Sequence, residues 1–317
     1  MTIQSSRPGI PADILALSHE RDELRRRGKY DRADALKRQI EEAGYGIKDN
    51  PRGAHLIVLP SVEVDGVVYR TARQMPSLLD EEDRCEFSIN ILANASFEDT
   101  KRCLESVLRS IENRNIEIIL VDNGSLDQLN AWFKELQRDD SRLHMLSTSR
   151  PLGEAEARNI GLKQSRGTSI LLLDSSVELT GDVFTPLAQV LADSSVGITG
   201  FKGLSAEDLR HFEESSALEV EAIEGSCMAF RRKLLKKIGL FDERYRFPYY
   251  MDIDFNFAVR NSGAQAIVTP NLPMISHPQL QDVQLSDAER TRLTKRNFYR
   301  FLEKWGHRDD LLPEDKE

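Results

Sequence analysis

The sequence predicts an α/β fold, with a mostly parallel sheet between about residues 87 and 306 and a small helical module before it. Two observations carry this prediction. From Phe87 onward, short apolar runs alternate with segments of helical periodicity, a pattern typical of βαβ units. Before residue 53, apolar residues recur at helical spacing in two stretches that Gly28 separates. A parallel sheet therefore follows a helical hairpin.

The N-terminal stretches predict helices over 14–27 and 31–43. Gly28 ends the first helix and Gly44 ends the second, since glycine readily adopts the conformation that terminates helices. Asp31 is expected to cap the N-terminus of the second helix, because a carboxylate accepts the unpaired N–H groups there.

Two β-like runs follow at 55–59 and 67–70, and Asp65-Gly66 between them indicates a tight hairpin turn. The polar, acidic segment 71–86 is expected to be a linker. The predicted domains are a helical hairpin module (1–53), a β-hairpin and linker (54–86), the α/β domain (87–306) and an acidic tail (307–317).

Within the α/β domain, the sequence predicts four strands at 87–92, 117–121, 143–147 and 169–173, and helices at 98–113, 126–139 and 153–165. Right-handed crossovers bring the carboxyl ends of such strands to one edge of the sheet. Ligands of open α/β sheets bind at that edge. Asp122 and Asp174 directly follow two of the strands and are expected to lie there.

Composition narrows the class of protein. The net charge of −9 does not favour nucleic acid as a partner of the whole chain. Three cysteines without a CxxC pair predict reduced thiols rather than a disulfide framework or a zinc site. The N-terminus has no secretory pattern, and the apolar run 170–173 is too short to span a bilayer. A cytoplasmic protein without a membrane span is expected.

Asp122-Asn123-Gly124 follows a predicted buried strand. The carboxylate of Asp122 could accept hydrogen bonds from a base or ribose, and Gly124 would allow close backbone approach. A capping turn with Ser125 is the alternative interpretation. Asp174 could contact a Mg²⁺ or Mn²⁺ ion, which prefers oxygen ligands, or could cap its own strand end.

Asp252 and Asp254 begin a predicted helix. They could favour its dipole, or one of them could deprotonate an acceptor hydroxyl as a general base. His277 could bind a metal through its imidazole, although a structural role is the alternative for an isolated loop histidine.

Taken in order, these motifs resemble the family-2 class of GT-A glycosyltransferases over about residues 88–306. The motifs that carry the resemblance are CLES at 103–106, VDNGS at 121–125, ARNIG at 157–161, LLDSS at 172–176, GSCM at 225–228, IGLFDE at 238–243, MDID at 251–254 and FLEKWG at 301–306. The resemblance implies a GT-A fold, which is a Rossmann-like nucleotide-diphospho-sugar transferase domain.

The resemblance also implies roles for particular residues. Asp252 would be the base of a one-step inverting displacement, with Asp254 beside it. Asp174 and His277 would contact Mg²⁺ or Mn²⁺. Residues that would bind the donor are Asp122, Asn123, Gly124, Arg158, Asn159, Asp174 and Ser176.

Three departures from the family pattern favour a catalytically silent domain. Ser176 stands where the Asp-x-Asp motif has its second acid, which is expected to weaken the metal site. Met251 replaces the glutamate before the base, and the asparagine expected near the end of the first strand is displaced to Asn94.

The N-terminal segment 14–53 has a separate resemblance, to the C-terminal tail of cysteinyl-tRNA synthetases. Its motifs are KYDRADALKRQI at 29–40 and IKDNPRG at 47–53. Arg25, Arg26, Arg27, Lys37 and Arg38 could contact RNA phosphates, but acids balance them, and a solvated hairpin for packing is the favoured interpretation.

Three functions follow from the sequence. The first is a glycosyltransferase that moves a sugar from a UDP- or GDP-type donor to an unidentified hydroxyl acceptor. The second is a catalytically silent GT-A domain that serves as a binding scaffold. The third is an RNA-associated protein. The oligomeric state, including a homo-oligomer, stays open.

Overall fold

The computed structural model describes residues 10–50, 53–93, 96–111, 114–124, 127–247, 249–278 and 286–312. The chain forms two compact units, Met1–Met75 and Pro76–Glu317. Ser125, Asn94 and the end of the acidic tail, 313–317, lie outside the described residues. No helix in the described part of the chain is both long enough and apolar enough to cross a membrane.

The first unit begins with a helical hairpin, as the sequence predicts. Its helices are α1 (Ala12–Arg26) and α2 (Tyr30–Glu42), and both glycines that end them have positive φ. The predicted cap at Asp31 is wrong. Lys29 precedes the helix, and Asp31 lies in the first turn, where a carboxylate still favours the helix dipole.

The strands of the first unit differ from the prediction. Strand β1 (Tyr45–Asn50) pairs with β2 (Gly53–Val58), and β3 (Val62–Val64) pairs with β4 (Val67–Tyr69). The turn at Asp65-Gly66 is confirmed, with φ of 45° and 88°. The run at 55–59 nevertheless belongs to the earlier hairpin, because it pairs with β1. Strand β1 was not predicted, since its sequence contains Gly and Asp, which are uncommon in strands.

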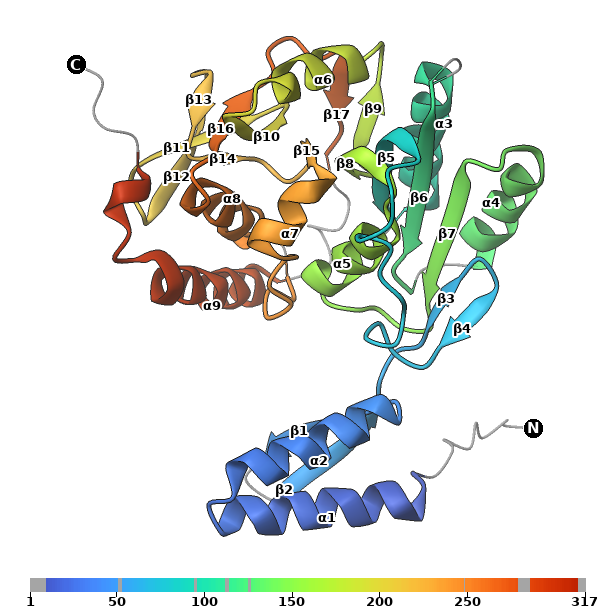
Figure 1. Ribbon diagram of the computed structural model, residues 1–317, viewed down its shortest axis with the longest axis vertical. Helices are drawn as coiled ribbons and strands as arrows, with labels where there is room; N and C mark the ends of the chain where they lie inside the picture. The colour runs from blue at the N-terminus through green and yellow to red at the C-terminus, as the bar shows by residue number, and fades with distance from the viewer. Residues whose placement is uncertain are drawn as a thin grey trace. The chain divides into compact units, whose positions relative to one another are not determined.

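The second unit is built on one twisted sheet, with strands in the order β13-β16-β10-β15-β8-β5-β6-β7. Figure 1 shows β8, β5, β6 and β7 next to one another in the middle of this unit. The four predicted strands are β5 (Cys85–Ala93), β6 (Ile116–Asp122), β7 (Leu143–Thr148) and β8 (Gly167–Asp174), and they pair in parallel.

The structure has a helix in each of the three ranges predicted for the α/β domain, 98–113, 126–139 and 153–165, whereas the strands outside the four parallel ones were not predicted. The strands are β9 (Val177–Leu179), β10 (Val196–Gly200), β11 (Gly203–Asp208), β12 (His211–Ser215), β13 (Glu219–Val220), β14 (Ala222–Ile223), β15 (Cys227–Arg231), β16 (Gln265–Val268) and β17 (Met274–Ser276). The helices are α3 (Phe97–Ser110), α4 (Asp127–Asp139), α5 (Glu154–Gln164), α6 (Phe184–Ala192), α7 (Leu235–Ile238), α8 (Met251–Asn261) and α9 (Asp287–Trp305). Strand β15 runs antiparallel to β8.

Both faces of the sheet are covered. Leu171 and Leu173 point into a core shared with α3, α4 and α6, whereas Ile170 and Leu172 point into a core shared with α5 and α8. Because side chains alternate along a strand, a strand buried on both faces is apolar throughout. This explains the continuous apolar run of β8.

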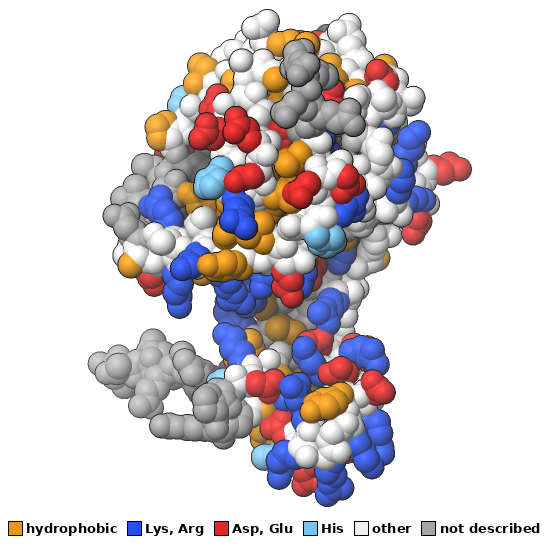
Figure 2. All heavy atoms as spheres, turned by 90° about the vertical axis from the view of Figure 1, so that its left-hand side faces the viewer, with side chains coloured by type: hydrophobic (Ala, Val, Ile, Leu, Met, Phe, Trp, Pro, Cys, Tyr) orange, Lys and Arg blue, Asp and Glu red, His pale blue; other side chains and the backbone are white. Residues whose placement is uncertain are grey.

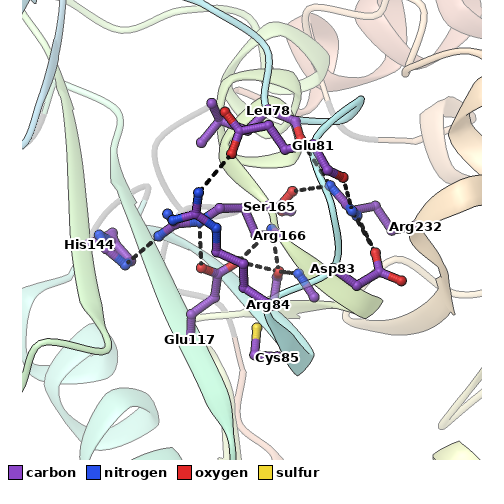
Figure 3. Close-up of polar contacts among 12 residues, drawn as sticks. Leu78, Glu81, Asp83, Arg84, Cys85, Glu117, His144, Ser165, Arg166 and Arg232 are labelled. Atoms are coloured by element: carbon purple, nitrogen blue, oxygen red, sulfur yellow. Dashed lines mark hydrogen bonds and ion pairs between the residues drawn. The ribbon is translucent and has the colours of Figure 1, made fainter.

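Part of the segment expected to be a linker is bonded to the second unit. The buried guanidinium of Arg232 donates to the backbone carbonyls of Leu78 and Glu81 at 2.9 and 2.6 Å, and to the carboxylate of Asp83 at 2.5 Å (Figure 3). It also donates to the carbonyl of Ser165. Residues 78–83 are therefore held in place by a charge that would otherwise be buried without partners.

Candidate active site

The carboxyl ends of the parallel strands bring Asp122 and Asp174 to the same edge of the sheet. In the strand register, Asp122 lies opposite Ala93 of β5, and Asp174 lies opposite Leu92 on the other side of β5. The two carboxylates thus flank the end of one strand, as expected for a ligand site of an open α/β sheet.

Asp122 is a buried carboxylate, 2% exposed. Its Oδ2 accepts a hydrogen bond from the amide of Asn130 at 2.9 Å, and the hydroxyl of Ser147 donates to the other end of that amide at 3.1 Å. These contacts come from α4 and β7, so the orientation of Asp122 is fixed by neighbouring elements of the sheet.

The Asn123-Gly124 turn is hydrogen-bonded to the loop before α5. The side chain of Asn123 accepts from the N–H of Leu152 at 2.8 Å and donates to its carbonyl at 3.2 Å. Gly124 has a φ of +75°, and a Cβ there would lie 2.6 Å from the backbone nitrogen of Pro151. The position therefore requires glycine, and Asn123 orients the loop.

Arg158 brings a buried positive charge to this edge. It lies on α5, is 5% exposed, and its guanidinium forms an ion pair with Asp174. Its Nε lies 3.5 Å from the carboxylate of Glu154. Burial lowers the pKa of Arg158, but the charges of Asp174 and Glu154 outweigh it and the pKa is raised. Arg158 is charged at every pH of interest.

The neighbour of Arg158, Asn159, holds another loop. Its amide donates to the carbonyl of Phe241 at 2.9 Å and accepts from the N–H of the same residue at 3.0 Å. Because its carboxamide is engaged in this way, Asn159 contributes to the site by positioning the segment around Phe241.

Asp252 lies at the start of α8, where its charge acts on the carboxyl group of Glu224. Its Oδ2 accepts from the N–H of Gly225 at 3.0 Å, and its Oδ1 accepts from its neighbour Ile253. Burial raises the pKa of Asp252, while these backbone N–H groups and the charge of Arg158 lower it less strongly. A carboxylate with a raised pKa is suited to accept a proton near neutral pH.

Glu224 belongs to the same group of acids and was missed in the sequence. Burial raises the pKa of Glu224, and the charges of Asp252 and Asp174 raise it further. The hydroxyl of Ser226 donates to its carboxylate at 2.6 Å. No periodicity or motif spacing in the sequence distinguishes Glu224 from a surface glutamate. Only the fold shows that Glu224 lies near the other acids of the candidate site.

The backbone before Asp252 is strained. Tyr249 and Tyr250 have φ angles of 66° and 64°, at a cost of roughly 1–3 kcal/mol each. The buried amide of Asn297 on α9 donates to the carbonyls of Phe247 and Tyr249 at 3.0 and 3.1 Å. These contacts hold the turn that presents the start of α8.

Asp254 differs from Asp252 in its surroundings. It is 4% exposed, and its carboxylate accepts from Nε1 of Trp305 at 2.8 Å and from Nζ of Lys304 at 2.9 Å. Both donors come from α9. Asp254 therefore ties α8 to α9.

The described residues do not form a suitable set of ligands for a divalent metal. Asp174 is paired with Arg158, and His277 lies with its Nε2 2.9 Å from the carboxylate of Glu178. Ser176 provides no carboxylate. Across the described ranges, no group of three or more His, Cys, Asp or Glu side chains is arranged to hold a metal ion.

In the first unit, acidic side chains lie beside the basic residues considered for RNA. Arg25 is 3.8 Å from Asp49, and Arg27 is 3.6 Å from Glu23. Figure 2 shows blue and red side chains intermixed on this unit. RNA association and the resemblance to cysteinyl-tRNA synthetases stay predictions.

An open sheet with carboxylates at the carboxyl ends of its parallel strands is the arrangement in which α/β proteins bind ligands. Comparison with known proteins narrows this class. Residues 91–239, a little under half of the chain, match the family model "Glycosyl transferase family 2".

Solved structures agree on the fold. A crystal structure of GalNAc-T7 with UDP, GalNAc and Mn²⁺ aligns with a TM-score of 0.59 at 16% identity, covering 71% of this chain and 49% of that one. A mannosyltransferase from Pyrobaculum calidifontis in complex with GDP-Man and Mn²⁺ aligns with a TM-score of 0.50 at 16% identity, covering 75% and 80%. The second unit has the GT-A fold, as predicted, and residues 91–239 within it are similar to family-2 glycosyltransferases.

Curated relatives match this chain over part of its length and over a minor part of their own. "Uncharacterized protein y4gI" of Sinorhizobium fredii is 23% identical over 66% of this chain and 26% of its own length. "Glycosyltransferase GlyG" of Streptococcus pneumoniae is 29% identical over 30% of this chain and 32% of its own length. A Campylobacter jejuni protein named GalNAc(5)-diNAcBac-PP-undecaprenol beta-1,3-glucosyltransferase is 32% identical over 27% and 29%. This chain thus spans about a quarter to a third of the length of these relatives.

Proposed function

We propose that the chain is a glycosyltransferase that moves a sugar from a nucleoside-diphosphate donor to a hydroxyl acceptor with inversion at the anomeric carbon. The observation that carries the proposal is the position of Asp252. It lies at the start of α8, within electrostatic reach of Arg158 and Glu224, and its raised pKa suits a general base.

In this reaction the acceptor oxygen attacks the anomeric carbon as its bond to the diphosphate oxygen breaks. Asp252 takes the proton of the acceptor hydroxyl, and the electron pair of the broken bond leaves with the nucleoside diphosphate. Attack opposite to the leaving group inverts the configuration. Positive charge near the departing diphosphate is the main stabilisation that such a step requires.

Asp122 is proposed to contact the base or ribose of the donor. It is buried at the end of β6 and is oriented by Asn130. UDP- and GDP-sugars are both candidate donors, as the two solved structures named above contain UDP and GDP-Man respectively.

The test is calorimetric titration of UDP and GDP, in the presence of Mn²⁺, on the wild type and on Asp122→Asn. The asparagine retains an oxygen for Asn130, so the turn is expected to fold while the donor loses an anionic acceptor. Asp139→Asn, an exposed aspartate at the end of α4, is the matched control.

Binding that weakens in Asp122→Asn but not in Asp139→Asn supports a working donor site. A screen of UDP- and GDP-sugars for release of the nucleoside diphosphate would then identify the donor. If neither nucleotide binds the wild type, the transferase proposal fails and a catalytically silent scaffold replaces it.

A further inference from the structure

The negative charge that develops on a departing diphosphate is stabilised by cations or by hydrogen-bond donors placed beside it. The two solved structures with the same fold hold Mn²⁺. In this chain, the segment that closes β8 reads Asp174-Ser175-Ser176, so it offers one carboxylate. Serine hydroxyls are weaker ligands than carboxylates for a hard divalent cation.

That one carboxylate already has a cation beside it. The guanidinium of Arg158 forms an ion pair with Asp174 and is almost completely buried. The other predicted metal ligand, His277, lies against Glu178 instead. The geometry thus places a fixed organic cation at the strand end where a metal was expected.

Arg158 also has capacity for a further partner. Its Nε is buried, lies 3.5 Å from the carboxylate of Glu154, and forms no hydrogen bond to a described residue. The charge of Arg158 also lowers the pKa of the proposed base, Asp252, so the guanidinium acts on both the strand-end carboxylate and the base. An arginine presents five donors in a planar fork that matches phosphate oxygens.

We infer that this transferase works without a divalent metal, and that the guanidinium of Arg158 neutralises the diphosphate of the donor while Asp174 holds it in position. The inference rests on the proposed function. As the bond from the anomeric carbon to the diphosphate oxygen breaks, the negative charge that develops on that oxygen faces Arg158, and the acceptor proton passes to Asp252.

The experiment measures binding of UDP and GDP by calorimetry, first in EDTA and then with Mn²⁺ in excess. The variants are Arg158→Gln, which removes the charge, and Arg158→Lys, which keeps it. Arg142→Gln is the matched control, because it breaks another arginine–aspartate pair, with Asp140 at 2.6 Å, away from the carboxyl ends of the strands.

We expect the wild type to bind with affinities that differ by less than about threefold between EDTA and Mn²⁺. Arg158→Gln should bind about 10- to 100-fold more weakly, since charge-assisted hydrogen bonds to the diphosphate are lost. Arg158→Lys should recover part of the affinity, and Arg142→Gln should bind as the wild type does. Thermal unfolding checks that each variant is folded.

Two results would overturn the inference and leave the proposed function standing. One is nucleotide binding that EDTA abolishes and Mn²⁺ restores. The other is wild-type affinity in folded Arg158→Gln. If the wild type binds neither nucleotide in either condition, the proposed function and the inference both fail.

Discussion

Replacing Asp252 with asparagine tests the proposed base with a minimal change of shape. Asparagine can still accept the N–H of Gly225, which lies 3.0 Å from Oδ2, but its amide cannot take up a proton. General-base catalysis contributes roughly 10²- to 10⁴-fold, or about 2.7–5.4 kcal/mol of activation free energy. We expect kcat to fall by this factor while nucleotide affinity stays within about threefold of the wild type.

The assay is release of the nucleoside diphosphate from a donor sugar, with water as acceptor until the acceptor is identified. Asp254→Asn is the matched control, because it alters the same helix two residues away and keeps an oxygen for Trp305. Its kcat should stay within about tenfold of the wild type.

The same substitution has an expected effect on stability. The folded protein raises the pKa of Asp252 above the ordinary value of 3.8, so the ionised carboxylate destabilises the fold above that pH. Asp252→Asn should therefore have a Tm equal to or higher than that of the wild type near neutral pH. This gain should disappear below about pH 3.8.

Unchanged kcat in Asp252→Asn would refute the assignment of the base. Equal losses of kcat in Asp252→Asn and Asp254→Asn, with both proteins folded, would show that the two carboxylates act together in catalysis. The buried carboxylate of Asp254 would then also contribute to the reaction. A fall in Tm with the fall in kcat would point to damage of α8 rather than to lost proton transfer.

The remaining predictions concern pH, the donor turn and the contact between α8 and α9. The kcat/KM of the wild type should fall on the acid side with a midpoint above 3.8, because Asp252 accepts a proton only when it is ionised and its pKa is raised; a pH profile checks this, and Asp252→Asn should lack that limb. Gly124→Ala should weaken nucleotide binding and lower Tm, because its Cβ would meet the backbone; Gly239→Ala, with a similar φ of +83° and open space, should show only the backbone strain of about 1–2 kcal/mol. Trp305→Phe should lower the free energy of unfolding by about 1–3 kcal/mol, since it removes the 2.8 Å donor to the buried carboxylate of Asp254; denaturant titration measures this, and an unchanged midpoint would contradict it.

The elements with strong periodicity could be predicted from the sequence. The four parallel strands and the helices between them follow from runs of apolar residues and from turn residues, which depend on local neighbours. The weaker strands could not be predicted. Strand β1 contains Gly46 and Asp49, and β13 and β14 have two residues each, so their identity depends on the strands that pair with them.

The candidate site also has features that the sequence predicts and features that depend on the tertiary structure. The sequence by itself determined that Asp122 and Asp174 each end a strand of the parallel sheet and that Asp252 begins a helix. Topology rules then bring the two strand ends to one edge of the sheet. Only the tertiary structure decided which partners these acids have. Arg158 pairs with Asp174, which is 16 residues away in the sequence, and Trp305 donates to Asp254, which is 51 residues away. Such pairings follow from burial, which brings distant charges together because neither is stable alone in the interior.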